Sequence, residues 1–220
     1  MRYKDLAQGS HTFSARAKDA EGNVDPTPPS CTWTIITNRP PVADAGGPYF
    51  GKEGTSISLS ASRSADPDYN IVLYEWDLDT DGLFDDATGV KSAFKAIDNG
   101  IFTIRVRVTD AGGLSSIDNA IVTVKNVAPV IKSLSVNSLI RVGSWVNARA
   151  TFMDVGINDT FTAVWKWGDN ATSTGAINGG IVSGSHIYTK PGIYLVTITI
   201  TDEDGGVGQA IKLIIVLPKK

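Results

Sequence analysis

Residues 194–205 read YLVTITITDEDG, and two earlier stretches repeat this pattern: FTIRVRVTDAGG at residues 102–113 and FSARAKDAEG at residues 13–22. In each copy apolar and polar residues alternate, which places every second side chain on one face of a β-strand. An Asp and a Gly then supply a tight turn. The copies recur at an interval of about 90 residues, the size of one small β-sandwich domain. The sequence therefore predicts an all-β chain built from tandem sandwich modules.

A second strand follows each copy, and we expect the three strand pairs to be the last hairpins of consecutive modules. These second strands are predicted at residues 30–36, 120–124 and 209–216. Linkers with proline follow the first two, NRPP at 38–41 and NVAP at 126–129, where proline ends strand pairing and stiffens the junction. We therefore divide the chain into the C-terminal hairpin of an incomplete module at 1–37, a first sandwich at 38–126 and a second sandwich at 127–220.

The first unit contains only its C-terminal hairpin. A lone hairpin is marginally stable in water, so residues 1–37 are expected to be disordered, docked on the next module or paired with another chain unless the rest of their module lies upstream. No apolar stretch of signal-peptide length follows Met1, which we interpret as an internal or engineered start. The sequence thus predicts a segment of a longer polypeptide, with neighbouring domains as partners and any export signal outside the segment.

The composition narrows the class of protein. Hydrophobic residues make up 42% and charged residues 20% of the chain, which excludes a disordered acidic tail and a membrane protein. The most apolar run, residues 211–217, is too short to cross a bilayer, so no membrane insertion is expected. A net charge of −3 lacks the basic excess that nucleic acid binding requires. Cys31 is the single cysteine, which excludes an internal disulfide and a Cys-rich zinc site.

Two short motifs in the third unit carry a family resemblance. They are WGDN at 167–170 and SHIYTKPGIY at 185–194, and together they resemble the polycystic-kidney-disease (PKD) repeat. The second unit is similar through ADAGGPY at 43–49, SADP at 64–67 and YEWDLDTDG at 74–82. It departs from the pattern at Phe94 and Ala96, where His-x-Tyr is usual, and at Asn99-Gly100, where Pro-Gly is usual. The first unit, with LAQGSHTF at 6–13 and GNVDPTPPSCTWT at 22–34, resembles the C-terminal end of a bacterial Ig-like repeat.

The resemblance implies tandem Ig-like/PKD β-sandwiches at the cell surface or in a secreted protein. The implied function is that of a non-catalytic spacer and adhesion module that contacts a protein or polysaccharide ligand. Trp76 and Trp167 are expected to fill the space between two facing sheets. Two alternatives stay open at this point: an accessory substrate-binding region of a larger secreted hydrolase, and a stalk that calcium makes rigid.

The strongest candidate metal site is DLDTDGLFDD at residues 77–86. Carboxylates at the first, third, fifth and ninth positions with glycine at the sixth reproduce the first part of a calcium loop. The candidate Ca²⁺ ligands are Asp77, Asp79, Asp81 and Asp85, whereas the twelfth position is Thr88 in place of a bidentate acid. Two interpretations remain, a weak calcium site and an acidic hairpin turn without metal.

Other polar groups point to structural roles. Asp154, Asp169 and the DEDG stretch at 202–205 are expected to cap turns through backbone amides. His11 and His186 are the only histidines, no nucleophile-elbow motif is present, and His186 lies in the PKD-like strand. The sequence therefore predicts that the chain is not an enzyme.

Overall fold

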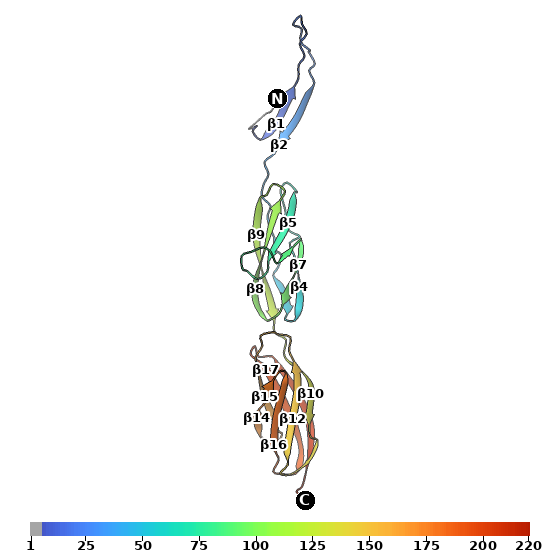
Figure 1. Ribbon diagram of the computed structural model, residues 1–220, viewed down its shortest axis with the longest axis vertical. Coiled ribbons are helices and arrows are strands. Elements are labelled where there is room, and N and C mark those ends of the chain that lie inside the picture. The colour runs from blue at the N-terminus through green and yellow to red at the C-terminus, as the bar shows by residue number, and fades with distance from the viewer. Residues whose placement is uncertain (1–5) are drawn as a thin grey trace.

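The computed structural model describes residues 6–220, which form 18 β-strands and no helix (Figure 1). Residues 1–5, including the Met1 interpreted as an internal start, lie outside the described residues. Nothing in residues 6–220 forms a helix that could span a lipid bilayer. The predicted fold class, all-β with tandem sandwiches, is confirmed.

An isolated hairpin opens the described chain. Strands β1 (Gly9–Ser14) and β2 (Ser30–Ile35) pair antiparallel, with Gly9 opposite Ile35. The hairpin stands apart from the first sandwich in Figure 1, so it is not docked on that module. Cys31 in β2 is exposed, because no second sheet covers the hairpin.

The first module consists of two facing sheets. Its five-stranded sheet has the order β3-β9-β8-β5-β6, and its two-stranded sheet pairs β4 with β7. The strands are β3 (Tyr49–Lys52), β4 (Thr55–Ser60), β5 (Ile71–Asp77), β6 (Ala87–Thr88), β7 (Lys91–Ala96), β8 (Gly100–Asp110) and β9 (Ser115–Lys125).

The second module repeats this plan with a larger second sheet. The five-stranded sheet has the order β11-β18-β17-β13-β14, and the four-stranded sheet the order β10-β12-β16-β15. The strands are β10 (Val130–Val136), β11 (Leu139–Arg141), β12 (Trp145–Met153), β13 (Phe161–Lys166), β14 (Thr172–Thr174), β15 (Ala176–Asn178), β16 (Ile181–Ile187), β17 (Gly192–Asp202) and β18 (Val207–Leu217).

The repeated pattern forms the last hairpin of each module, β8–β9 and β17–β18. The final strand of each module also pairs in parallel with an early strand, β3 with β9 and β11 with β18. The observed β9 begins at Ser115 and not at Ala120, because the polar residues before Ala120 still pair with the backbone of β8. The hairpin is therefore longer than its apolar pattern indicates.

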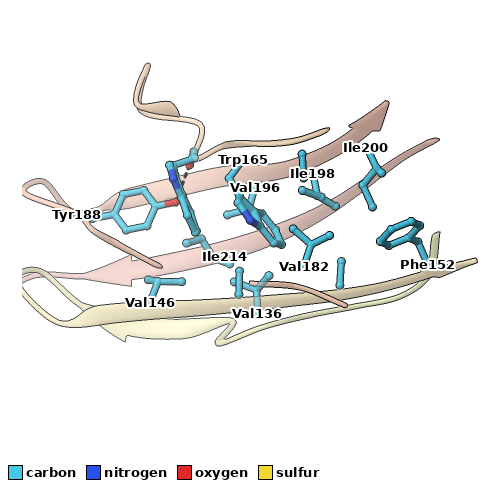
Figure 2. Packing of buried hydrophobic residues seen from close by; sticks show 14 of the residues in the cluster. Val136, Val146, Phe152, Trp165, Val182, Tyr188, Val196, Ile198, Ile200 and Ile214 are labelled. Carbon is cyan, nitrogen blue, oxygen red and sulfur yellow. Dashed lines mark hydrogen bonds between the residues drawn. The ribbon is translucent and has the colours of Figure 1, made fainter. Parts of the chain in front are cut away.

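The alternation buries one face of each sheet in a module core. Trp76 is fully buried in the first core, and Trp167 is 1% exposed in the second, as predicted. Trp165 is also fully buried, whereas Trp145 is 62% exposed. Figure 2 shows the second core, in which buried side chains from both sheets, Trp165 among them, fill the space between the sheets.

The aspartate that ends the first strand of each hairpin also holds the linker that precedes its module. One carboxylate oxygen of Asp110 accepts two turn amides at 2.8 and 2.9 Å, and the other accepts the side-chain amide of Asn38 at 2.7 Å. Asp202 likewise accepts the side-chain amide of Asn126 at 3.0 Å. Both aspartates are buried. Each linker is thus fixed to the module that follows it.

Candidate functional site

The acidic turn after β5 brings three of the four predicted calcium ligands together. Asp77, Asp79 and Asp81 each place a carboxylate oxygen within 4.8 Å of the other two. Asp77 is buried at the end of the strand, whereas Asp79 and Asp81 are exposed. The backbone of Thr80 and Gly82 adopts the left-handed region, with φ of 63° and 92°. The turn therefore curls its alternate carboxylates toward a common point.

The fourth predicted ligand, Asp85, does not belong to this group. Its neighbour Asp86 instead accepts the backbone amides of Leu78 and Asp79 at 2.6 and 3.3 Å. In a calcium loop the chain would continue around the ion and bring the ninth position to it. Here the chain folds back at residue 87 to pair β6 with β5, which turns Asp86 toward the start of the loop.

Hydrogen bonds inside the turn already occupy part of each clustered carboxylate. The backbone amide of Thr80 donates to Asp77 at 2.7 Å, and the amide of Asp81 donates to Asp79 at 3.1 Å. The remaining oxygen of Asp77, Oδ2, is buried without a hydrogen-bond partner, and Nη1 of Arg105 lies 3.8 Å from it. A guanidinium at this distance competes with a metal ion for the same charge.

His186 has the structural environment that the sequence predicts. Its Nε2 lies 2.7 Å from Oδ2 of Asp169, and its ring stacks on Trp167 with centroids 5.2 Å apart. Burial opposes ionisation of Asp169, but the hydrogen bonds from His186 and from the Ala171 amide outweigh it and hold the pKa of this carboxyl below its usual range. The rings of Tyr188 and His186 also make an edge-to-face contact, with centroids 4.6 Å apart.

The remaining predicted turn caps separate into different environments. Asp154 and Asp169 are not brought together, since Asp169 binds His186 while Asp154 groups with Glu53 and Asp159. Asp202 accepts the Gly206 amide at 2.7 Å, as a turn cap does. Sequence reasoning did not identify Glu53, which lies in the turn between β3 and β4 of the other module.

The two modules meet through loops as well as through the linker. The loop between β12 and β13 reaches the loop between β7 and β8, where the Ile157 amide donates to the Ile97 carbonyl at 3.2 Å. The next residue, Asn158, donates its side-chain amide to Asp98 at 2.8 Å. These contacts add a second connection beside the covalent linker.

Exposed apolar side chains gather on the outer face of β17 and β18. Ile193 lies opposite Ile215, and Leu195 lies opposite Leu213, in alternate rungs of the ladder that face outward. All four are at least 39% exposed, and Ile211 on the next rung is 58% exposed. The corresponding hairpin of the first module carries arginines at positions 105 and 107 on its outer face. A continuous aliphatic face is thus a feature of the second module.

Exposed aromatic side chains, in contrast, do not form a row. Phe50, Tyr69 and Trp145 are the most exposed aromatics among the described residues, at 65%, 96% and 62%. Phe50 lies on β3, Tyr69 in the loop before β5 and Trp145 on β12 of the other module. They therefore present no shared flat surface.

The fold and these sites define a chain of tandem all-β sandwich modules. Side-chain hydrogen bonds fix the linkers to the modules. A family model of the PKD domain matches residues 38–124 and 126–215, and the chain belongs to the PKD domain family. PKD domains are non-catalytic modules and are typical of extracellular adhesion and interaction proteins.

Several known proteins are similar to parts of the chain. The human dyslexia-associated protein KIAA0319 is 31% identical over 130 residues, which are 56% of this chain and 12% of that protein. The PKD1 domain of the metalloprotease PrtV from Vibrio cholerae is 30% identical and covers 41% of this chain and 98% of its own, with a TM-score of 0.33. The PKD domain of an M14-like peptidase from a Thermoplasmatales archaeon is 23% identical, covers 43% and 100%, and has a TM-score of 0.37.

Proposed function

We propose that this chain is a non-catalytic spacer and interaction segment of a larger extracellular or cell-surface protein. The observation that carries the proposal is the bonded junction between the two sandwiches. The linker residue Val127 donates its amide to Glu53 of the first module at 2.7 Å, while Asn126 binds Asp202 of the second. Each end of the linker is therefore tied to a folded module, which suits a spacer of fixed direction.

Small-angle X-ray scattering on the whole chain tests the spacer function. The matched variant carries four inserted residues, Gly-Ser-Gly-Ser, between Val127 and Ala128. We expect the wild type to fit one arrangement of the modules, and the variant to require an ensemble with a wider spread of maximum dimensions. An equal spread of maximum dimensions in the wild type and the insertion variant would contradict the proposal, because the short linker would then add no rigidity.

The aliphatic face of the second module supports a protein partner over a polysaccharide. Exposed apolar patches mark surfaces that contact other proteins, and Leu195 and Leu213 lie side by side on this face. Sugar rings stack on flat aromatic side chains, which are scattered here. The proposed partner is therefore a protein with an apolar contact surface. The alternative function is that of an accessory substrate-binding region of a larger secreted hydrolase.

Affinity electrophoresis separates these two functions. The chain is run through gels that contain soluble cellulose derivatives, chitosan or starch, beside a Trp145→Ala variant. We expect unchanged mobility in every gel. Retardation that Trp145→Ala removes would contradict the protein-contact proposal and favour the presentation of polymeric substrate to a catalytic domain.

A calcium ion at the acidic turn of the first module is a second proposal. It is supported by the unpartnered Oδ2 of buried Asp77 beside the carboxylates of Asp79 and Asp81. A weak extracellular site has a dissociation constant of about 10⁻⁴ to 10⁻³ M. The test is thermal melting of the whole chain with and without millimolar calcium, with Asp79→Ala plus Asp81→Ala as the variant. An equal calcium shift in both proteins would contradict a site at this turn.

A further inference from the structure

The smaller sheet of the first module has an open edge at a position that the second module fills with its own chain. β7 and β16 are equivalent strands, since each directly precedes the last hairpin of its module. β16 lies between β12 and β15, whereas β7 pairs only with β4. In the first module the chain between β5 and β7 forms β6, which pairs with β5 of the other sheet. Within residues 6–220 one edge of β7 is therefore without a partner strand.

The hydrogen bonds of β7 show which backbone groups lie along this edge. The carbonyl of Ala96 accepts the amide of Gly54, which leads into β4, at 2.7 Å. In an antiparallel pair, alternate residues direct their amides and carbonyls to opposite sides of the strand. Lys91, Ala93 and Lys95 therefore direct these groups away from β4, and we call their outward backbone groups the β7 edge. Such a row of donors and acceptors is a template for a further strand.

The second module already bonds to one end of the β7 edge. The carbonyl of Ile97, the next outward group after Lys95, accepts the amide of Ile157 at 3.2 Å. A pocket of about 460 Å³ lies beside this contact, lined by Ile97, Val155 and Ile157 and by the adjoining ends of β4 and β7. These three apolar side chains are 43%, 46% and 69% exposed. The edge therefore ends at a pocket with room for an apolar side chain, which gains free energy by leaving water.

The exposed face of β7 carries positive charge. Lys91 and Lys95 are exposed and lie on either side of Ala93 on this face, and neither forms an ion pair with a residue of the described chain. Opposite charges on neighbouring strands stabilise a sheet, and like charges directly opposite each other destabilise it. Antiparallel pairing of two copies about Ala93 would place Lys91 opposite Lys95 of the other copy. The charges therefore favour an acidic strand over a second copy of this chain.

We propose that the β7 edge binds an extended acidic segment of a partner protein, which adds to the sheet as an antiparallel strand. Main-chain hydrogen bonds hold the segment, and its side chains give the selectivity. Two acidic residues four positions apart face Lys91 and Lys95. An apolar residue two positions before the first acid lies on the same face and enters the pocket beside Ile97. The inference goes beyond the proposed spacer function, and the β7 edge is separate from the aliphatic face of β17 and β18.

Fluorescence anisotropy of a labelled peptide with the whole chain tests the site. The peptide Leu-Val-Glu-Val-Thr-Val-Glu places its leucine at the pocket, its glutamates opposite the two lysines and its threonine opposite Ala93. One control peptide has lysine in place of both glutamates. The other has proline in place of the threonine, which removes the amide that donates to Ala93 and keeps the charges. We expect the glutamate peptide to bind at least about tenfold more tightly than either control.

Variants of the chain locate the peptide on β7. Lys91→Glu plus Lys95→Glu should reverse the preference, so that the lysine peptide binds more tightly than the glutamate peptide. The matched control is Lys52→Glu plus Lys125→Glu, which makes the same change of charge on β3 and β9 of the other sheet and should alter binding less than about twofold. All four lysines are exposed, so neither variant disturbs the core. Amide hydrogen exchange should slow at Ala93 when the glutamate peptide is added.

Three outcomes would overturn the proposal. Equal binding of the glutamate and proline peptides would mean contact without strand addition. No binding of the glutamate peptide at up to about 1 mM would mean that the lysines only keep the edge unpaired. A dimer in light scattering that Ala93→Pro abolishes would mean that a second copy occupies the edge. None of these outcomes bears on the spacer function, which small-angle scattering of the insertion variant tests separately.

Discussion

Asp110 and Asp202 occupy equivalent places in the two sandwiches, and each uses its two oxygens for different tasks. One oxygen closes the turn of the last hairpin, and the other binds the linker asparagine before the module. The repeated Asp-Gly pattern predicts the turn. It does not predict the bond to Asn38 or Asn126, because the partners are more than 70 residues apart.

Replacing Asp202 by alanine should destabilise the second module by about 2–4 kcal/mol, since buried donors would lose a charged acceptor. Urea denaturation followed by tryptophan fluorescence measures this loss. Asp204→Ala is the control, because its side chain is exposed. Equal midpoints for the two variants would contradict the role assigned to Asp202.

The Asp169–His186 contact makes a pH-dependent prediction. The pKa of Asp169 is lower in the folded chain than its usual value, so its stabilising contribution is present above that value and is lost as the pH falls through the folded pKa. We expect His186→Ala to lower the free energy of unfolding by about 2–3 kcal/mol at neutral pH. When the pH falls below about 4, the free energy of unfolding should decrease less in the variant than in the wild type. Parallel curves of unfolding free energy against pH would contradict this account.

Individual strands differ in how well the sequence defines them. The alternation in β8 and β17 is complete, and their predicted positions are correct. The start of β9 is missed because Ser115 and Ser116 resemble turn residues although they pair with β8. In the acidic turn, the spacing predicts the grouping of Asp77 with the next two alternate acids, but it misplaces Asp85. The position of Asp85 depends on the pairing of β6 with β5, and no local sequence pattern predicts that pairing.

The four-stranded sheet depends on a glycine opposite the central tryptophan. A β-carbon at Gly184 on β16 would lie 2.6 Å from Cδ1 and Nε1 of Trp165. Gly184→Ala should therefore lower stability by about 1–3 kcal/mol through overpacking. Ser185→Ala, at the exposed neighbouring position, is the control for differential scanning calorimetry. An unchanged melting temperature for Gly184→Ala would show that the two sheets can move apart at no cost.

At the scale of the whole molecule, the sequence predicts modules in series but not their junction. The prolines at 129 and at 40–41 indicate linkers, and the period gives the number of sandwiches. Glu53 has no motif that marks it, and it meets Asp154 and Asp159 only when two folded modules are placed end to end. Contacts of this kind depend on tertiary packing and leave no pattern in a single module.

The fixed arrangement of the two sandwiches is the central claim, and pulsed electron paramagnetic resonance tests it most directly. Spin labels are placed at Lys91→Cys and Lys190→Cys, both exposed, in a Cys31→Ser background that removes the exposed native thiol. We predict one narrow distance distribution between the modules. A broad distribution, or several separate distances, would contradict the account.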